Sequence, residues 1–570
     1  MGSRSLFSWL VCCALPFVAL AAVGPLSAAP FDLVITHGRI IDGTGSPWYS
    51  GDVGIRAGRI AAIGELGAEP RTRTIDAQGM VVAPGFIDML GQSEESILVD
   101  PRLPSKIYQG ITTEITGEGE SAAPLNDGIL KARALKYRHY HITPTWRTLG
   151  EYFAHVEKQG MGINLASYVG ATTVREMVLG YEDRQPNSAQ LQQMQELVRA
   201  AMREGAVGVS TSLEYPPAPY AHTEEIIALA AAAAPFGGIY ATHMRSEGDA
   251  IMASLDETVR IGREAHIPVE IWHIKVAGKA NWGRMPDVIR VINAARASGI
   301  DISANTYAYT AWFNDMTAFL PPWVYDGGRE KLIARLKDPD ARARMRKEML
   351  EPSSNWDNEW QEIEGPEAVM IGFVQNPDLQ QFQGKRLSDV AKIWNKDPID
   401  ALFDLLIADQ GYTQNAVFGM TEPAVLLALQ QPWVSIDNDS QGTSPEGLLG
   451  QEHPHPRAYG TFPRILAKYV REEKALTLED AIRKMSALPA QRMRLTERGV
   501  LKQGLWADVV VFDPATIKDL ATFEHPNQLS QGMQYVLVNG APVIDAGKMT
   551  GKLPGKVLRG AGYQPPKPAT

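Results

Sequence analysis

The 570-residue sequence has almost no cysteine: Cys12 and Cys13, the two that it contains, both lie close to its start. They fall inside an apolar run, Leu6–Val23, that follows a basic residue and precedes the small residues of Leu26–Ala29. A basic start, an apolar centre and small residues at the cleavage position are typical of a secretory signal. We therefore expect residues 1–28 to be removed on export, leaving a mature chain with no disulfide, thiolate ligand or cysteine nucleophile.

Long apolar runs and clusters of basic residues are also absent. No later stretch approaches the roughly 20 uninterrupted apolar residues that a membrane-spanning helix needs, so we expect no membrane span in the mature form. The formal net charge is −10, and Lys and Arg are not clustered as they are in proteins that bind nucleic acid. A composition of 45% hydrophobic and 21% charged residues is typical of a globular protein. We expect a secreted or periplasmic protein whose partner is a small polar molecule.

The middle of the chain alternates β-rich runs with helical segments. Predicted strands are Gly162–Gly170, Gly205–Thr211, Gly237–His243, Ile267–Ile274 and Ile300–Tyr307. Predicted helices between them include Ser188–Arg203, Thr223–Ala234 and Asp249–Ala265. Four consecutive crossovers predict a parallel sheet. Earlier strands that end at Asp88 and Thr116 and a late one at Val434–Asp439 bring the number to eight. An α/β fold with a closed (β/α)8 barrel is therefore favoured over an open sheet.

The two ends of the chain have a different pattern. Phe31–Leu66 and Gly499–Asp545 both contain short alternating strands separated by glycine turns, and we expect them to pair into one small β-sandwich. A charged stretch at 315–371 interrupts the alternation and predicts an insertion over the barrel mouth. The predicted division is a signal at 1–28, sandwich parts at 29–80 and 491–560, a barrel at 81–490 and a tail at 561–570.

Two histidines lie at the ends of neighbouring predicted strands. His243 closes GGIYATH, and His273 lies near the end of IPVEIWHI, thirty positions later, which is about the length of one βα unit. The carboxyl ends of barrel strands carry the reacting groups. A single histidine at such a place is more often a hydrogen-bonded packing residue. The pair in register indicates a site for a zinc-like ion.

Several long segments occur in the order seen in a known family. They are VVAPGFID, GITTEITGEGESAAPL, GVSTSLEYPPAPYA, YATHMRSEGD, IWHIKVAGKANWG, HPHPRAYGTFPR and ADVVVFDP. On these segments, from about Phe31 to Gly560, the chain resembles the D-aminoacylase (N-acyl-D-amino-acid deacylase) family of the amidohydrolase superfamily. The resemblance implies a metal-dependent hydrolase of linear amides on a barrel. It also implies that His243 and His273 are metal ligands and that Asp439, in VSIDND, is the general base, with Asp437 as the competing candidate.

Two segments depart from the family pattern. The family follows GFID with His-x-His, whereas this chain has Leu90 and Gln92 at those positions. Relatives carry a cysteine ligand on strand two, whereas this chain has Gly-Glu-Gly-Glu. Alignment from the preceding residues places Gly119 at the cysteine position, and alignment from the following residues places Glu118 there. We expect Glu118 to be the ligand, with Glu120 second and two surface acids in a glycine-rich loop as the alternative.

The expected metal site has three protein ligands, namely Glu118, His243 and His273. Three ligands with a fourth position open to water are typical of a catalytic zinc rather than a structural one. Neither Leu90 nor Gln92 offers an imidazole or a carboxylate for a second ion. We therefore expect about one zinc-like divalent ion per chain.

Substrate-binding residues are expected near this site. Lys275 lies two residues beyond the second of the paired histidines and so on the same side of an extended strand. The resemblance implies that Arg457, in HPHPRAYG, and Tyr215, in EYPPAP, lie near the substrate carboxylate, which a guanidinium can hold in a bidentate way. His453 and His455 are in a proline-rich turn and are expected to be structural.

The function favoured by the sequence is hydrolysis of an N-acyl amino acid, of D configuration, or of a related small amide. A dipeptidase or a cyclic-amide hydrolase of the same superfamily is one alternative. A non-catalytic binding protein is another, because the His-x-His pair is missing. Against the second alternative, the chain keeps His243, His273, Lys275, Asp439 and Arg457 together.

Overall fold

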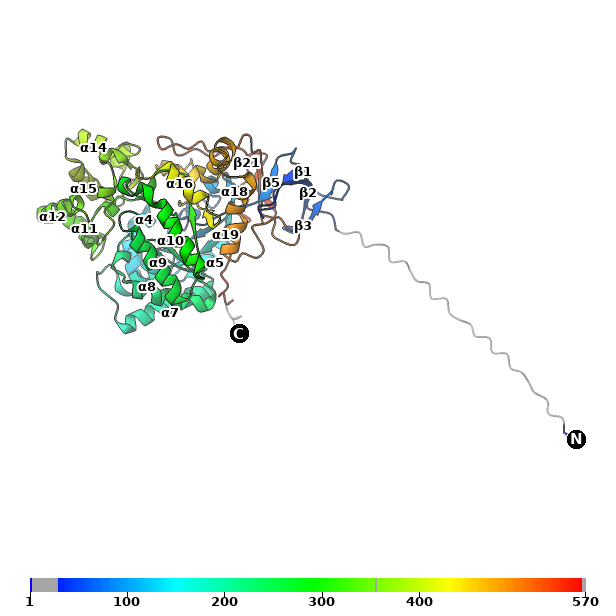
Figure 1. The fold of residues 1–570 in the computed structure, drawn as a ribbon, viewed down its shortest axis with the longest axis horizontal. Helices are drawn as coiled ribbons and strands as arrows, with labels where there is room; N and C mark the ends of the chain where they lie inside the picture. The colour runs from blue at the N-terminus through cyan, green and yellow to red at the C-terminus, as the bar shows by residue number, and fades with distance from the viewer. Residues whose placement is uncertain (3–28, 354–355, 566–570) are drawn as a thin grey trace.

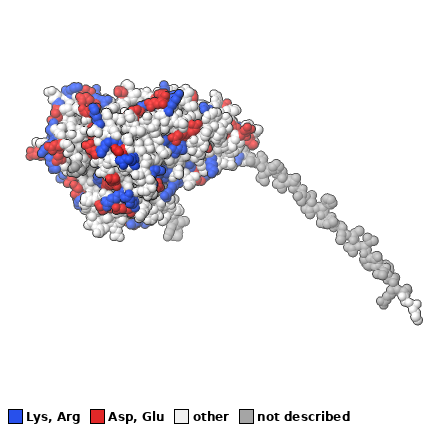
Figure 2. All heavy atoms as spheres, in the orientation of Figure 1, with Lys and Arg blue, Asp and Glu red and all other residues white. Residues whose placement is uncertain are grey.

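The computed structural model describes residues 1–2, 29–353 and 356–565. The predicted cleavable signal, with Cys12 and Cys13, lies outside these residues except for its first two. Among the helices that are described, none is long and apolar enough to cross a membrane. Figure 2 shows basic and acidic side chains interspersed over the face in view, with no large area of one sign on that face.

A six-stranded sheet forms the centre of the protein, and all its neighbouring strands are parallel. Its order is β17-β13-β12-β11-β10-β9. The strands are β9 (Val169–Gly170), β10 (Gly208–Ser212), β11 (Ile239–His243), β12 (Val269–Ile271), β13 (Ile302–Thr306) and β17 (Val434–Ile436). They lie within the predicted runs or extend one residue past them, and the predicted parallel pairing is confirmed.

A second parallel sheet has three strands in the order β6-β7-β8. They are β6 (Phe86–Asp88), β7 (Ile111–Thr116) and β8 (Asn164–Ser167). Only Tyr168 separates β8 from β9 of the first sheet. At the opposite edge, the loop after β6 meets the loop after β17. They are joined by a parallel bridge between Gly91 and Ser440 and by a 2.9 Å hydrogen bond from Asp439 N to Leu90 O. The two sheets are therefore in contact at both edges.

Helices connect the parallel strands and cover them. They are α5 (Leu149–Gln159), α6 (Ala171–Leu179), α7 (Ser188–Glu204), α8 (Thr223–Ala233), α9 (Ile251–Ala265), α10 (Met285–Ala297) and α16 (Glu422–Leu429). The sequence of α7 explains both its ends. The side chains of Asn187 and Gln190 cap its first turn reciprocally, and Gly205, at φ 113°, ends it. Its buried face is Met194, Val198, Ala201 and Met202.

The chain between β13 and α16 forms a separate group of elements. Its three strands pair antiparallel in the order β14-β16-β15. The elements are β14 (Trp312–Asp315), α11 (Arg329–Lys337), α12 (Pro339–Leu350), α13 (Glu359–Glu362), β15 (Val369–Ile371), α14 (Leu387–Trp394), α15 (Pro398–Ala408) and β16 (Gln414–Val417). Figure 1 shows α11, α12, α14 and α15 at the end of the molecule away from β1–β3. This interruption of the parallel strands is longer than the predicted stretch at 315–371.

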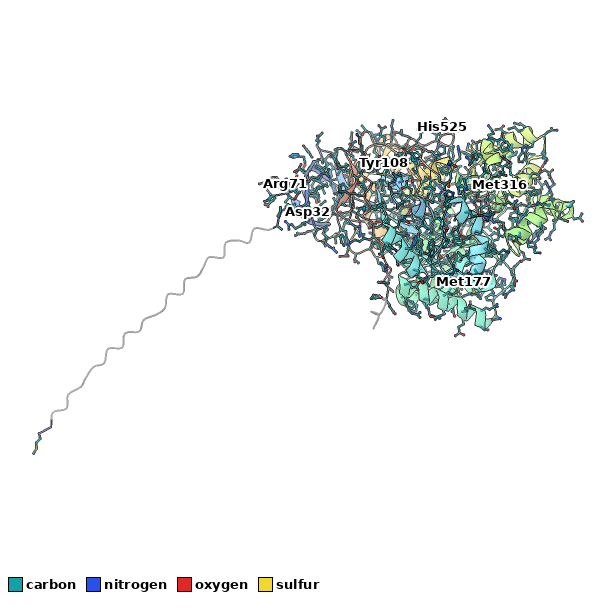
Figure 3. All side chains as sticks on the ribbon, turned by 180° about the vertical axis from the view of Figure 1, so that it is seen from behind. Asp32, Arg71, Tyr108, Met177, Met316 and His525 are labelled. Carbon is teal, nitrogen blue, oxygen red and sulfur yellow. The ribbon has the colours of Figure 1, made fainter. Side chains whose placement is uncertain are left out.

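Strands from both ends of the chain form one nine-stranded sheet. They are β1 (Leu33–Ile40), β2 (Tyr49–Arg56), β3 (Arg59–Gly64), β4 (Thr74–Asp76), β5 (Val81–Pro84), β18 (Val509–Phe512), β19 (Met533–Val538), β20 (Ala541–Asp545) and β21 (Lys548–Met549). The antiparallel pairing of β5 with β18 joins the two ends. Figure 3 places Asp32 and Arg71 of this sheet region at one end of the molecule and Met316 near the other.

The remaining helices lie before β8 and after β17. They are α1 (Ser96–Val99), α2 (Pro104–Ile107), α3 (Asp127–Ala132), α4 (Ala134–His139), α17 (Arg457–Arg464), α18 (Leu478–Met485) and α19 (Ala487–Arg492). Of these, α2 and α17 carry charged residues that reach the carboxyl ends of the parallel strands.

Candidate metal centre and active site

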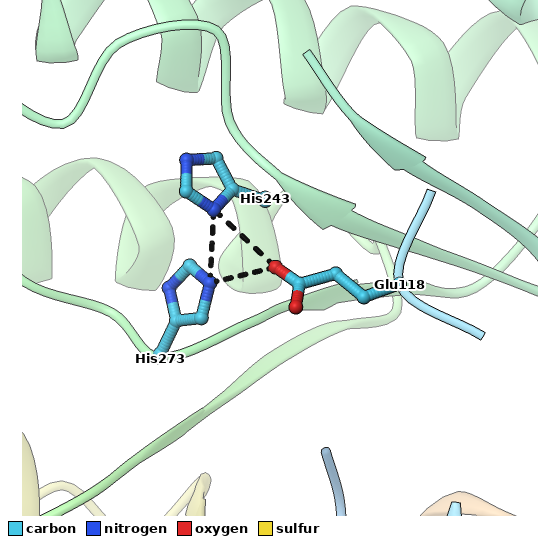
Figure 4. Close-up of side chains that lie close together, drawn as sticks. All are labelled: Glu118, His243 and His273. Carbon is cyan, nitrogen blue, oxygen red and sulfur yellow. Dashed lines mark hydrogen bonds and ion pairs between the residues drawn. The ribbon is translucent and has the colours of Figure 1, made fainter. Parts of the chain in front are cut away.

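His243 and His273 come from neighbouring parallel strands. His243 is the last residue of β11, and His273 follows β12 by two residues. Thr242 is in register with Ile271, so the two rings project from the same edge of the sheet. His243 Nδ1 lies 3.0 Å from His273 Nε2, and both residues are buried. The two imidazoles therefore converge as predicted (Figure 4).

Glu118 completes a triangle with the two histidines. Its Oε1 atom lies 3.4 Å from His243 Nδ1 and 3.2 Å from His273 Nε2. Gly117, at φ 97°, and Gly119, at φ 65°, form the turn after β7 that presents Glu118. Both angles are in the left-handed region, which glycine adopts without steric cost.

The triangle has the dimensions of a zinc site. Tetrahedral bonds of about 2.0–2.1 Å place ligand atoms about 3.3 Å apart, and the three observed separations are 3.0, 3.2 and 3.4 Å. Glu120 is elsewhere: its carboxylate is 3.1 Å from Arg133 Nη2 and half exposed. Of the two acids that the sequence left open, the structure brings Glu118 to the histidines.

Two glutamates that the sequence patterns did not reveal lie near the far nitrogens of the rings. Glu214 Oε2 is 2.7 Å from His243 Nε2, and Glu247 Oε1 is 3.1 Å from His273 Nδ1. When His243 Nε2 donates its proton to Glu214, Nδ1 of His243 keeps a lone pair for an ion. His273 Nδ1 also faces the Lys275 ammonium group, which lies 2.8 Å away and can only donate. The signals were available, because Glu214 precedes Tyr215 and Glu247 lies four residues after His243.

The local charges favour an ionised carboxylate at Glu118. Burial raises the pKa of Glu118, but hydrogen bonds to His243 and His273 outweigh burial and hold this pKa well below its usual range. Burial lowers the pKa of His243, and the nearby carboxylates, first Glu247 and then Glu118 and Glu214, raise it well above its usual value. An ion at the triangle therefore replaces protons on the imidazoles.

Asp439 lies beside the triangle on the loop after β17. Gln92 Nε2 donates to Asp439 Oδ1 over 3.1 Å and to Glu118 Oε2 over 2.6 Å. Arg457 Nη1 lies 2.6 Å from Asp439 Oδ2. Burial raises the pKa of Asp439 although Arg457 and His273 oppose it. Asp439 lines a cavity of about 970 Å³, which we call the main cavity, so it can take a proton from a molecule bound there.

The competing candidate, Asp437, lies in a different place. It is fully buried, and neither of its carboxylate oxygens has a hydrogen-bond partner among the described residues. It is also not among the residues that line the main cavity. Burial, followed by the charge of Asp439, raises the pKa of Asp437 well above its usual value. This geometry favours Asp439 as the base.

Backbone conformation also marks the site. His273 has φ 35° and Asp439 has φ 45°, values that are uncommon for residues with a side chain. The amide of His273 donates to Asn305 Oδ1 over 2.7 Å, which helps to hold this conformation. Such backbone outliers cluster at functional sites, where surrounding contacts maintain them.

Other side chains occupy the region after β6, where the family has the His-x-His pair. Leu90 is buried in an apolar cluster with Met89 and Trp272. Behind it, the fully buried Lys106 donates to Asp88 Oδ2 over 2.7 Å and lies 3.2 Å from Glu114 Oε2. The β6 side of the candidate metal centre therefore carries an apolar side chain and an ammonium group paired with carboxylates, and neither of these can be a metal ligand.

The three predicted substrate-binding residues differ in their position relative to the main cavity. Lys275 and Tyr215 line it. Lys275 Nζ is 2.8 Å from His273 Nδ1 and forms an ion pair with Glu247. Arg457 is not among the lining residues; it is 2% exposed and lies behind Asp439.

His453 and His455 have structural contacts. His453 Nε2 is 2.8 Å from Phe523 O, and His455 Nε2 is 3.1 Å from Ala311 O. His455 Nδ1 accepts from the amide of Arg457 over 2.9 Å. Burial lowers the pKa of both rings. His455 also lines the main cavity, and the structural assignment of both histidines stays a prediction.

Comparison with known proteins gives the family. The model of the amidohydrolase family matches residues 448–544. D-aminoacylase of Alcaligenes xylosoxydans xylosoxydans is 36% identical over 530 residues, covering 93% of this chain and 98% of the relative. The chain therefore belongs to the D-aminoacylase (N-acyl-D-amino-acid deacylase) family of metal-dependent amidohydrolases.

Two solved structures are similar over the same length. N-acyl-D-glutamate deacylase of Bordetella bronchiseptica, in complex with zinc and a phosphonate mimic of the tetrahedral intermediate, has a TM-score of 0.78 and 35% identity, covering 93% of this chain and all of that one. A D-aminoacylase with a binuclear metal centre, described as activated by one metal and attenuated by the second, has a TM-score of 0.76 and 34% identity at the same coverage.

Proposed function

We propose that this protein is a metal-dependent deacylase of N-acyl-D-amino acids. The observation that carries the proposal is the triangle of Glu118, His243 and His273, which lies beside Asp439 in one cavity of a chain that belongs to this family. A dipeptidase, a cyclic-amide hydrolase and a binding protein are the alternatives that the experiment below separates.

We propose one zinc-like ion per chain, held by these three side chains. Their donor set of two imidazoles and one carboxylate suits zinc. A second ion lacks ligands on the β6 side, where Leu90 and Gln92 stand. The zinc complex of one relative supports the choice of metal, and the one-metal activation of another, whose centre is binuclear, supports a single activating ion.

A bound ion of this kind supplies Lewis acidity toward the amide carbonyl and toward the attacking water. Asp439 takes a proton from the water and passes it to the departing amine. Gln92 and Arg457 orient the Asp439 carboxylate through its two oxygens. Glu214 keeps the imidazole of His243 in the tautomer that leaves its Nδ1 atom free of a proton.

Lys275, Tyr215 and Arg457 are our candidates for binding the substrate carboxylate. Lys275 and Tyr215 support this assignment through their place in the cavity lining. Arg457 would reach a substrate only if its contact with Asp439 rearranges, so its assignment depends on the family resemblance alone. Each of the three supplies a donor that suits a carboxylate.

The test is a substrate panel with the zinc-loaded protein and parallel metal analysis. We expect release of free amino acid from N-acetyl-D-amino acids, and much slower release from their L enantiomers. The Asp439→Ala variant should bind the ion and lose most turnover. Preferential hydrolysis of dipeptides or cyclic amides would contradict the proposal, as would a zinc-loaded protein without any hydrolase activity.

We further propose the architecture and location that the sequence predicts. The parallel strands of the two sheets close into one (β/α)8 barrel at about 81–490, and segments 29–80 and 491–560 pack as a β-sandwich. The contacts at both edges of the parallel sheets and the pairing of β5 with β18 support this division. Residues 1–28 direct the chain to a secreted or periplasmic location, which N-terminal sequencing of the mature protein would test.

A further inference from the structure

Five carboxylates line one side of the cavity next to His243. They are Glu214, Glu247, Asp357, Glu359 and Glu362, and we call them the acidic cluster. Glu214 follows β10, Glu247 follows β11, and the other three lie in or just before α13. The group therefore forms where the chain between β13 and α16 meets the carboxyl ends of the parallel strands.

Specific contacts fix the acidic cluster in place. Ser246 Oγ donates to Asp357 Oδ1 over 2.6 Å, and the amide of Glu247 donates to Asp357 Oδ2 over 2.9 Å. These bonds tie α13 to the loop after β11. Glu362 lies against Gly248, where a Cβ atom would be only 1.5 Å from Glu362 Oε1. Only glycine at position 248 leaves enough space for the Glu362 carboxyl group in this position.

The acidic cluster contains few basic partners. Glu247 pairs with Lys275, and Glu214 pairs with His243. Among the described residues no basic group forms an ion pair with Asp357, Glu359 or Glu362. Burial and neighbouring carboxylates raise the pKa of Glu359 and of Glu362 well above the usual range, and the pKa of Asp357 to about 7.

Two oxygens of the acidic cluster have no hydrogen-bond donor among the described residues outside the cluster, although Glu359 contacts Glu214 and Glu362 contacts Asp357. Glu359 Oε1 accepts from Trp312 Nε1 and Asn314 Nδ2, but Glu359 Oε2 has no hydrogen-bond partner within the described part of the chain. The same holds for Glu362 Oε1. The two residues are 2% and 6% exposed. A buried carboxylate oxygen without a donor is unfavourable, so a ligand that donates hydrogen bonds and carries positive charge fits here.

The basic side chains elsewhere in the cavity are placed differently. Arg133 contacts Glu120 and Glu176, and Lys136 contacts Glu95. Arg329 also lines the cavity and donates to Gln410 O and Gly411 O. None of these three cations pairs with the acidic cluster.

We infer that the acidic cluster binds a cationic group of the substrate, so that the preferred substrates are N-acyl amino acids with an ammonium or guanidinium side chain. The inference rests on the proposed function and names its substrate class. A second carboxylate, as in the substrate named for N-acyl-D-glutamate deacylase, would meet like charge on this side of the cavity and be disfavoured.

A divalent cation is the competing occupant, because Glu214, His243 and Glu247 also offer ligand atoms within 4.8 Å of one another. However, His243 Nε2 must keep its proton for Nδ1 to serve the triangle with Glu118. That requirement favours an organic cation. An ammonium or guanidinium group needs only hydrogen-bond acceptors, whereas a metal ion would need the lone pair of His243 Nε2.

The experiment compares kcat/KM of the zinc-loaded protein for N-acetyl-D-lysine, N-acetyl-D-arginine, N-acetyl-D-norleucine and N-acetyl-D-glutamate. We expect the cationic substrates to exceed norleucine, which has a similar length, by about tenfold or more, and glutamate to be the poorest. Glu359→Gln and Glu362→Gln should each lower the lysine-to-norleucine ratio by about tenfold. Glu367→Gln, at an exposed glutamate of the same segment, is the control and should keep the wild-type ratio.

The outcomes separate the inference from the proposed function. A wild-type preference for norleucine or glutamate, or an unchanged ratio in both glutamine variants, would overturn the inference alone. A second tightly held metal ion that either variant loses would overturn it in favour of a metal site. Failure to hydrolyse any N-acetyl-D-amino acid would overturn the proposed function as well. If one variant does not fold, the other variant and the wild-type ranking still decide.

Discussion

Each candidate metal ligand has one atom in the triangle and a second atom held by a neighbour. His243 Nε2 faces Glu214, His273 Nδ1 faces Lys275 and Glu247, and Glu118 Oε2 accepts from Gln92. Because the second atoms are occupied, the first atoms point at one another before any ion binds. Such orientation raises metal affinity, since less freedom is lost when the ion binds.

The ligand assignment predicts different metal contents for two neighbouring glutamates. Glu118→Ala should lose the ion, because one of three ligands disappears, and turnover should fall with it. Glu120→Ala should keep the ion, because Glu120 contacts Arg133 rather than the histidines. Elemental analysis of the dialysed variants measures this. Full metal retention in Glu118→Ala, or two tightly held ions in the wild type, would show that the triangle is not the site.

The raised pKa of the buried Glu94 predicts that the free energy of unfolding depends on pH. Burial, followed by the charge of Glu95, raises the pKa of Glu94 from 4.5 to about 8. Below pH 4.5 its carboxyl group is protonated in both states, and between pH 4.5 and about 8 the unfolded state alone loses the proton. Stability attributable to Glu94 is therefore present at low pH and lost as the pH rises through this interval.

Glu94→Gln removes this loss. Relative to wild type, its free energy of unfolding should rise between pH 4.5 and 8, by on the order of 2–4 kcal/mol. Denaturant titrations at several pH values measure the difference. Glu65→Gln, at an exposed position, should follow wild type throughout. A Glu94→Gln curve parallel to wild type would contradict the prediction.

At the scale of elements, the sequence predicts the parallel strands well. The five runs between 162 and 307 all contain strands of the parallel sheets, because strands covered on both faces need uninterrupted β-branched and apolar residues. The helices between them have matching signals, as the caps of α7 illustrate. The resemblance and the strand ends together located His243, His273 and Asp439.

The missed features are those that depend on long-range contacts. Glu214 and Glu247 are ordinary loop glutamates in the sequence, and only the parallel register brings them to the histidine rings. Arg457 suggested a substrate contact, yet the position of α17 turns it toward Asp439. The pairing of β14 with β16 joins residues about one hundred positions apart, which no local pattern encodes.

Lys106 of α2 links elements that the sequence did not connect. Its ammonium group donates to Asp88 at the end of β6 and to Asn438 and Ser440 O after β17. Lys106→Met keeps the volume but leaves Asp88 and Glu114 buried without their cation. Such loss costs about 3–5 kcal/mol.

We therefore expect Lys106→Met to lower the denaturation midpoint clearly. Lys131→Met, at an exposed lysine paired with an exposed glutamate, is the matched control and should change stability by less than about 1 kcal/mol. A Lys106→Met protein as stable as wild type would mean that the two acids are neutral in the folded state and need no cation.

At the scale of the whole molecule, the two ends of the chain share one hydrophobic core. The apolar cluster of the terminal sheet combines residues such as Ile35 and Val82 from the start of the described chain with Val509, Val511 and Leu537 from its end. Closing so long a loop is entropically costly, though the cost rises only slowly with length. The terminal sheet therefore forms only when both ends of the chain come together. A destabilising substitution at one end should change the stability contributed by the other end.

Val82 and Val511 test this coupling, because they are antiparallel partners in β5 and β18 and are both fully buried. Each valine-to-alanine change should destabilise the protein by about 1–3 kcal/mol, the cost of a lost pair of methyl groups and a small cavity. Directly paired side chains share this cavity, so the double variant should deviate from the sum of the single changes by at least about 0.5 kcal/mol. Denaturant titration of the wild type, the two single variants and the double variant gives the coupling free energy.

Val369→Ala combined with Val82→Ala is the control, because Val369 belongs to β15 and to a different core cluster. The destabilisations of these two changes should add. Additive effects for Val82 and Val511 would mean that the ends of the chain contribute independently to stability.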